Sequence, residues 1–227
     1  MCGRFTLRAP NRIKVDGLRT AHLPSLEPRY NIAPSQQVLA ITGSRQQREL
    51  SLFVWGLIPS WSKEPKGFIN ARAETLELRA SFSDSFHRKR CLIPADGFYE
   101  WKRTGKSKRP YYFQLQDEGL FAFAGIWDEW RKDDVSITSC AIITTRPNDL
   151  VATIHDRMPV ILPAESHDLW LDPEAQPDEL TEILSPYPAA EMKSYPVSSE
   201  VNRPQNDNER LVIPVDPASG ETPSLFE

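Results

Sequence analysis

The sequence predicts a single α+β domain that is rich in β-strand and carries only short helices. Twenty prolines punctuate the 227 residues, and the apolar runs are short and separated by turn-forming residues, which is typical of β-structure. Hydrophobic residues make up 40% of the chain, and six Trp and ten Phe supply bulk for one core. We expect one domain over residues 1–215 and a loose tail over 216–227, where Pro, Ser, Gly and acidic residues lack periodicity.

The expected elements follow in order along the chain. Strands are expected where a short apolar run lies between turn signals, at Gln37–Thr42, Leu50–Trp55, Arg90–Pro94, Pro110–Leu115, Leu120–Ile126 and Ser139–Thr144. Thr104 and Gly105 form the expected tip of a hairpin that joins Phe98–Lys102 to Arg109–Phe113. Helices are expected at Leu76–Phe86, Ala164–Leu171 and Pro177–Leu184, with one helical turn at Asn148–Ile154. We therefore expect mostly antiparallel strands in a barrel-like core flanked by short helices.

The cysteines and histidines narrow the class of protein. Cys2, Cys91 and Cys140 cannot all pair and none belongs to a CxxC motif, which indicates a reducing compartment and no zinc site. The four histidines lack metal-ligand spacing, and we expect no metal and no cofactor. No apolar run approaches the ~18 residues of a membrane span, and no signal-peptide pattern is present. We expect a cytoplasmic protein that does not bind membranes.

Charge is distributed unevenly along the chain. The net charge is −4, but residues 165–227 hold 14 acidic and 3 basic residues, and residues 1–164 carry a net charge of +7. Residues 88–109 alone contain eight basic and two acidic residues. A basic body with an acidic end favours a polyanionic partner, although a solvated hairpin with surface lysines explains the same charges equally well.

The second residue, Cys2, carries the most specific chemistry in the sequence. Removal of Met1, which is usual before a small residue, would leave Cys2 with a free α-amine and a thiol on adjacent carbons. These groups titrate near ~7.7–8.0 and ~8.5, so both are partly nucleophilic at neutral pH. Such a pair forms an imine with an aldehyde and then closes through sulfur to a five-membered thiazolidine. A small residue at the start of a strand is the ordinary alternative.

Two amide-containing stretches stand out from ordinary strands. Asn31 lies within Arg-Tyr-Asn-Ile-Ala-Pro, where it also fits a turn. Asn70, Arg72 and Glu74 alternate with apolar residues, so an extended conformation would place all three on one face.

An acid and an imidazole add to this set. Glu100 lies among aromatic residues, and His155 precedes Asp156. Each has a structural explanation, since Glu100 could pair with a hairpin lysine and His155 with Asp156. Together with Cys2, however, an amide, a carboxylate and an imidazole make an imine-forming site.

Six sequence blocks then point to one family. They are, in order, Met-Cys-Gly-Arg-Phe, Arg-Tyr-Asn-Ile-Ala-Pro, Trp-Gly-Leu-Ile-Pro-Ser-Trp, Asn-Ala-Arg-Ala-Glu-Thr, Ile-Pro-Ala-Asp-Gly-Phe-Tyr-Glu-Trp and Ile-His-Asp-Arg-Met-Pro. The chain resembles the SRAP family, the SOS-response-associated peptidase family, whose members shield abasic sites in single-stranded DNA. The blocks span residues 2 to about 160, and the pattern extends to about 215.

The resemblance implies catalytic roles for four residues. Cys2 would join the ring-opened sugar aldehyde of an abasic site as a thiazolidine, and Asn70 would orient both by hydrogen bonds. Glu100 would bind the α-amine and move its protons. His155 would be the general acid and base that opens the sugar ring.

The resemblance also implies a DNA surface. Arg4, Arg72 and Arg157 match positions that meet the DNA backbone or support the site, and Trp61 and Trp101 match aromatic positions near the bases. Ser62 follows Trp61 where some members have a second tryptophan, so a weaker strand-parting wedge is expected.

Two other functions remain open at this stage. The same Cys and His would serve a cysteine peptidase, including one that only removes its own Met1. A reader that binds modified DNA without reacting is the third reading. The partners expected for the preferred function are single-stranded DNA containing abasic sites and replication proteins, with the protein acting as a monomer at the bacterial nucleoid.

Overall fold

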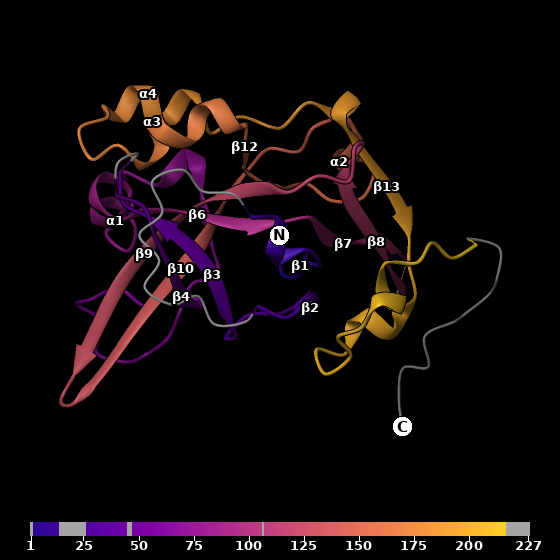
Figure 1. The fold of residues 1–227 in the computed structure, drawn as a ribbon, viewed down its shortest axis with the longest axis horizontal. Coiled ribbons are helices and arrows are strands. Elements are labelled where there is room, and N and C mark those ends of the chain that lie inside the picture. The colour runs from indigo at the N-terminus through magenta and orange to yellow at the C-terminus, as the bar shows by residue number, and fades with distance from the viewer. Residues whose placement is uncertain (1, 14–25, 45–46, 106, 217–227) are drawn as a thin grey trace.

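The computed structural model describes residues 2–13, 26–44, 47–105 and 107–216 (Figure 1). The strands are β1 (Phe5–Leu7), β2 (Arg29–Ile32), β3 (Gln37–Thr42), β4 (Glu49–Trp55), β5 (Asn70–Arg72), β6 (Arg90–Ala95), β7 (Gly97–Thr104), β8 (Ser107–Leu115), β9 (Phe121–Lys132), β10 (Val135–Thr145), β11 (Met158–Pro159), β12 (Ile161–Leu162) and β13 (Met192–Pro196). The α-helices are α1 (Ser83–Arg88), α2 (Asp149–Ala152), α3 (His167–Leu171) and α4 (Pro177–Glu182). The predicted α+β class, rich in strand, is confirmed.

A closed barrel forms one half of the fold. Its strands pair in the order β10-β4-β3-β6-β9, and β9 pairs again with β10. These pairs are antiparallel except for β4 and β10, which run parallel. β9 and β10 extend beyond the barrel as a two-stranded ribbon at the lower left of Figure 1. The short strand β5 lies parallel to β10, with Asn70 beside Ile142. The expected barrel-like core is confirmed.

Side-chain alternation along the barrel strands separates two apolar cores. On β9, the residues of the first core are Phe121 and Phe123, and those of the second are Ala122, Ala124 and Ile126. Helices α1, α3 and α4 cover the second core through Phe86, Trp170 and Leu180. Because successive side chains of a strand point to opposite faces, a slip of one residue would exchange the two cores.

A second, antiparallel sheet lies toward the right of Figure 1, in the order β13-β8-β7-β1-β2. β1 lies between β7 and β2, because Phe5 pairs with both Phe98 and Ile32. The expected hairpin forms from β7 and β8, and Gly105 at its tip has a φ of 62°, which glycine adopts without steric cost. The strand that follows Cys2 is therefore fixed in the interior of a sheet.

Several elements differ from expectation. The helix expected at Leu76–Phe86 is confined to α1, and a turn precedes it in which the Arg79 amide donates to the Thr75 carbonyl at 3.2 Å. Serines at 81 and 83 disfavour a continuous helix because their hydroxyls compete for backbone groups. Strands β1, β2 and β13 were not expected, since each is short and is defined by its partners rather than by its own pattern.

The tail expected over 216–227 lies outside the described residues except for Asp216. None of the helices in the described part of the chain is long and apolar enough to cross a membrane.

Candidate active site

Cys2 lies just before β1 and is completely buried. Its thiol is 3.9 Å from the carbonyl of Arg4. Asn70 donates a hydrogen bond of 2.8 Å from Nδ2 to the carbonyl of Cys2, and the parallel pairing of β5 with β10 holds Asn70 in place. The other amide atom, Asn70 Oδ1, is buried and makes no hydrogen bond within the described residues. The amide therefore fixes the backbone of Cys2 and keeps one acceptor available.

Burial keeps the Cys2 thiol protonated. Desolvation raises the pKa of the thiol above its ordinary value, and the nearby Glu100 carboxylate raises it further. A protonated thiol is a weak nucleophile, so the sulfur needs a proton acceptor at the moment it reacts.

Glu100 is an unusually weak acid for a carboxyl group. It lies on β7, and only 2% of its surface is exposed. Burial raises its pKa to about 7. A carboxyl group with that pKa exchanges protons readily in both directions near neutral pH.

His155 faces Glu100 from the turn after α2, with Nε2 3.8 Å from Glu100 Oε2. His155 Nδ1 lies 3.0 Å from the backbone amide of Arg157 and 3.3 Å from the Arg157 carbonyl, so it can accept from the amide in one tautomer and donate to the carbonyl in the other. Burial lowers the pKa of His155. Asp156 Oδ1 lies 3.0 Å from Nδ1, so the pairing with Asp156 considered from the sequence is present beside the Glu100 contact.

Arg157 supports the site from within the protein. Its guanidinium binds both carboxylate oxygens of Glu74, at 2.7 and 2.9 Å, and the carbonyl of Thr144 at 2.6 Å. Its side chain is 14% exposed. Glu74 lies in the 3-10 turn Ala73–Thr75, so the expected shared strand face ends at Arg72. Arg157 therefore holds the β5 segment and the His155 turn together.

Arg4 is likewise bound by protein groups. It donates to Asn31 Oδ1 at 2.8 Å and to the carbonyls of Val201 and Asn202 at 2.6 and 3.2 Å. Asn31 lies inside β2 and is completely buried, so the sequence-based interpretation of a turn residue is wrong. Its amide donates to three carbonyls of the segment that begins at Val201.

The remaining residues expected at the DNA surface reach solvent. Arg72 is exposed, and the indole of Trp61 is 64% exposed. Trp101 is half-buried and donates from Nε1 to Asn202 Oδ1 at 2.7 Å. The β7–β8 hairpin carries further exposed basic side chains, at Lys102, Arg103, Lys108 and Arg109.

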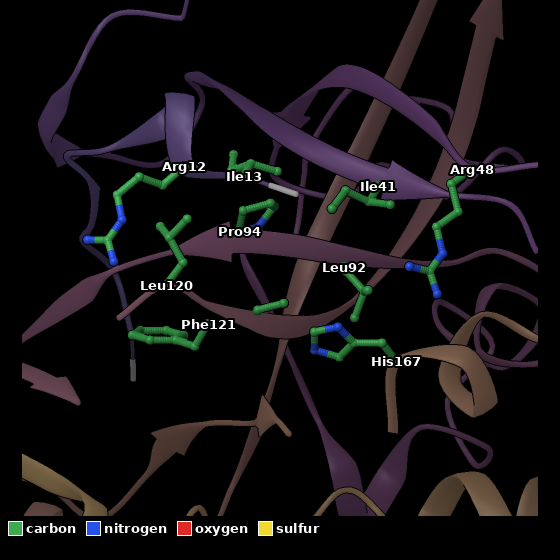
Figure 2. Close-up of a pocket in the computed structure, with 10 residues that line it drawn as sticks. Arg12, Ile13, Ile41, Arg48, Leu92, Pro94, Leu120, Phe121 and His167 are labelled. Atoms are coloured by element: carbon green, nitrogen blue, oxygen red, sulfur yellow. The ribbon is translucent and has the colours of Figure 1, made fainter. Parts of the chain in front are cut away.

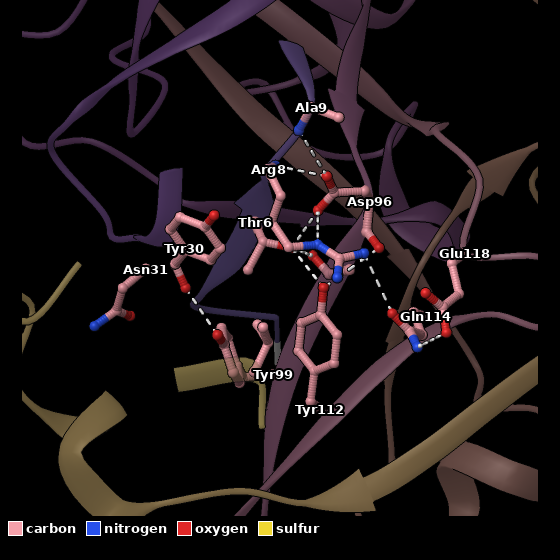
Figure 3. A network of polar contacts seen from close by, with 12 residues as sticks. Thr6, Arg8, Ala9, Tyr30, Asn31, Asp96, Tyr99, Tyr112, Gln114 and Glu118 are labelled. Carbon is pink, nitrogen blue, oxygen red and sulfur yellow. Dashed lines mark hydrogen bonds and ion pairs between the residues drawn. The ribbon is translucent and has the colours of Figure 1, made fainter. Parts of the chain in front are cut away.

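Sequence reasoning missed the polar network that anchors β1 (Figure 3). The buried Asp96 accepts hydrogen bonds from Thr6 Oγ1 at 2.6 Å and from the amides of Arg8 and Ala9 at 2.5 and 3.2 Å. Arg8 Nε lies 3.1 Å from the same carboxylate, and the Tyr112 hydroxyl is 2.8 Å from Thr6 Oγ1. The available signal was an acid between two apolar strands, β6 and β7, since buried carboxylates require partners.

The cavity drawn in Figure 2 lies elsewhere. It has a volume of about 240 Å³, with Leu92, Pro94 and Phe121 among its apolar walls and Arg12 and Arg48 at its ends. None of the expected site residues lines it. Within the described residues, no three His, Cys, Asp or Glu side chains are grouped so that they could hold a metal ion.

The structure thus gathers Cys2, Asn70, Glu100 and His155 at one end of the first core. The fold is a closed barrel joined to an antiparallel sheet. Its candidate active site is a buried cysteine at position two, with a carboxyl group and an imidazole nearby. The chain belongs to the SOS response associated peptidase (SRAP) family, whose model matches residues 1–204.

Comparisons with characterised proteins agree with this family. The chain is 45% identical to the abasic site processing protein YoqW of Bacillus subtilis, over 93% of this chain and 99% of that protein. It is 31% identical to the abasic site processing protein HMCES of Gallus gallus, over 83% of this chain and 67% of that one. A crystal structure of a Bacteroides thetaiotaomicron protein matches with a TM-score of 0.79 and 29% identity, over 90% of this chain and 97% of that one.

Proposed function

We propose that this protein processes abasic sites in single-stranded DNA by forming a thiazolidine crosslink through Cys2 after loss of Met1. The observation that carries the proposal is the convergence of Asn70, Glu100 and His155 on a buried cysteine at position two. Relatives such as YoqW are named abasic site processing proteins, which supports the same class of substrate.

The proposed reaction conserves atoms without an oxidant or reductant. His155 assists opening of the sugar ring, which exposes an aldehyde at C1′. The α-amine of Cys2 adds to this carbon, and loss of one water gives an imine. The Cys2 sulfur then adds to the imine carbon while the thiol proton passes to the nitrogen, which closes the five-membered ring.

Glu100 and Asn70 account for the proton transfers and the geometry. A carboxyl group with a pKa of about 7 can take a proton from the amine and return it to the departing water. The unfilled acceptor Asn70 Oδ1 can accept from the amine or from a sugar hydroxyl while Nδ2 holds the Cys2 carbonyl.

Non-covalent binding of the DNA would not depend on its base sequence. An abasic position has no base edge, so phosphate charge and stacking must supply the non-covalent affinity. Arg72 and the β7–β8 hairpin provide exposed cations, and Trp61 provides an exposed aromatic face. The covalent bond then selects the aldehyde.

The two pKa shifts argue against a peptidase. A cysteine peptidase works through a thiolate paired with an imidazolium. Burial raises the pKa of Cys2 and lowers the pKa of His155, and both shifts disfavour that ion pair.

The test is a denaturing gel with abasic single-stranded DNA, intact DNA, and abasic DNA whose aldehyde has been reduced to the alcohol. The parent protein should give one stable crosslink with the first substrate only. Cys2→Ala should give none while largely keeping non-covalent binding, and Cys2→Ser should give at most a reversible imine. A stable crosslink from Cys2→Ala would contradict the thiazolidine mechanism. Binding of abasic DNA without any crosslink by the parent protein would favour the non-covalent reader of modified DNA. Cleavage of added peptides would favour the peptidase.

A further inference from the structure

The loop that carries Trp61 connects β4 to β5, and its base is closed. Leu57 and Phe68 exchange backbone hydrogen bonds of 2.9 Å in both directions. Next to this bridge the backbones of Gly56 and Gly67 approach so closely that a Cβ at Gly67 would lie 2.3 Å from the Gly56 carbonyl oxygen. We call residues 57–68 the Trp61 loop.

Side chains of β9 and β10 hold the Trp61 loop at every second residue up to Ser62. Ser139 Oγ accepts from the Ile58 amide at 2.9 Å, Asp128 Oδ2 accepts from the Ser60 amide at 2.7 Å, and Trp130 Nε1 donates to the Ser62 carbonyl at 2.8 Å. The last two bonds flank Trp61 on both sides. The backbone of Trp61 is therefore fixed by groups that are far from it in sequence.

Asp128 is itself held firmly. Its side chain is 8% exposed, and Oδ1 binds Lys89 Nζ at 2.6 Å and the Glu129 amide at 2.8 Å. Burial opposes ionisation of this carboxyl group, but the hydrogen bonds from Lys89, Ser60 and Glu129 prevail and lower its pKa. An ionised, fully engaged carboxylate is a rigid anchor for the amide of Ser60.

The Trp61 side chain contrasts with this rigid support, because most of its surface faces solvent. An exposed indole on a fixed backbone loses little freedom when a planar ligand stacks on it. We infer that Asp128 and Trp130 are positioning residues for Trp61, which stacks on an unpaired base next to the lesion. This inference rests on the proposed function and adds the anchors of its stacking residue.

Charge and positioning predict opposite effects for Asp128. Removing an acid near a DNA surface strengthens binding if charge alone matters. Removing the anchor of Ser60 weakens binding if Trp61 needs its support. Glu129 is the matched control, because it is the next residue, carries the same charge, and binds Arg131 and Ser136 rather than the Trp61 loop.

The experiment measures affinity for abasic and intact single-stranded DNA in the parent and in a Trp61→Ala background. Since stacking contributes about 1–3 kcal/mol per base, we expect Asp128→Ala to weaken binding by roughly three- to tenfold in the parent and by less than ~2-fold without Trp61. Trp130→Phe, which keeps a six-membered aromatic ring but loses the indole N–H donor with the rest of the five-membered ring, should act in the same direction. Glu129→Ala should leave affinity unchanged or tighter. Equal losses in both backgrounds, or tighter binding by Asp128→Ala, would overturn the inference.

A measurement without DNA keeps the two proposals separable. Trypsin can cut the exposed loop after Lys63 and Lys66. Both Asp128→Ala and Trp130→Phe should speed cleavage at these sites. Glu129→Ala should leave the cleavage rate unchanged. Unchanged cleavage in both anchor variants would show that Asp128 and Trp130 do not hold the loop. If the parent binds no DNA, the proposed function fails together with the positioning role, whereas faster cleavage with unaltered DNA affinity overturns the positioning role alone.

Discussion

Burial sets the chemistry of individual residues in this site. It raises the pKa of the Cys2 thiol, lowers the pKa of His155, and raises the pKa of Glu100 to about 7. Glu100 is less exposed than His155, and its pKa is the one raised toward physiological pH. Residue type alone would have assigned that role to the histidine.

The raised pKa of Glu100 predicts a pH-dependent cost to stability. The folded state holds the proton up to about pH 7, whereas an unfolded carboxyl group releases it near 4.5, so folding binds a proton between these values. The stability of the parent relative to Glu100→Gln should therefore fall as pH rises from 4.5 to 7, by roughly 2–4 kcal/mol in total. Urea unfolding of both proteins across this range tests it, and parallel stability curves would contradict the raised pKa.

His155 is expected to act on the rate of crosslinking rather than on its occurrence. Open-chain aldehyde forms slowly without help, so His155→Ala should crosslink more slowly but to completion. The lowered pKa of His155 predicts that the parent rate changes with an inflection below pH 6.5, which the variant should lack. Single-turnover rates from pH 5 to 8 provide the measurement. An unchanged rate and profile in His155→Ala would make it a structural histidine.

At the scale of elements, two arginines near strand β5 have different surroundings. Arg72, at its end, is exposed, whereas Arg157 binds Glu74 and the Thr144 carbonyl across the neighbouring turn. The family resemblance implied for both a position that meets the DNA backbone or supports the site. The structure shows that Arg157 is engaged within the protein, which a one-dimensional pattern cannot reveal.

Salt dependence should distinguish these two arginines. Arg72→Ala should weaken binding to single-stranded DNA and reduce the slope of log affinity against log salt by about 0.7, the value for one neutralised phosphate. Arg157→Ala should leave the slope unaltered and instead lower the free energy of unfolding by about 1–3 kcal/mol, because the buried Thr144 carbonyl loses its donor and the exposed Glu74 loses its ion pair. Titrations at several salt concentrations and thermal melts test both. Equal salt slopes for the parent and Arg72→Ala would show that Arg72 is only a solvated cation.

Elements defined by residues close together in the sequence could be predicted, whereas those defined by distant partners could not. β3 lies at the expected bounds, Gln37–Thr42, because its apolar run is visible locally. The β7–β8 hairpin was readable from its turn. β1 and β13 depend on partners far along the chain, and the anchoring of Cys2 by Asn70 joins residues 68 positions apart. The family blocks pointed to the candidate site residues, but only the fold relates their atoms.

For the molecule as a whole, one carboxylate ties the C-terminal part of the described chain to β2. Asp207 accepts from Arg29 Nε at 2.5 Å and from the amides of Tyr30 and Asn31 at 2.5 and 3.0 Å. The segment it holds also contacts Arg4 and Trp101. The second sheet therefore reaches its final form only when both parts of the chain meet.

Loss of this tie should lower global stability. Asp207→Ala leaves two backbone amides and one guanidinium without their acceptor, so we expect a loss of about 1–3 kcal/mol in the free energy of unfolding. Glu209→Ala, two residues away and exposed, is the control. Chemical denaturation of the three proteins is the measurement, and equal midpoints for Asp207→Ala and the parent would contradict the role given to Asp207.

The position of β1 inside its sheet has a consequence for synthesis. Phe5 and Thr6 pair with Phe98 and Gly97 on one side and Phe5 pairs with Ile32 on the other, so the strand beside Cys2 lacks its β7 neighbour until about a hundred residues have left the ribosome. At roughly 5–20 residues per second, this interval is on the order of 5–20 s. During that time the cysteine is open to processing enzymes and to stray aldehydes alike. For the nucleophile proposed above, the topology of this sheet would place removal of Met1 before complete burial of Cys2.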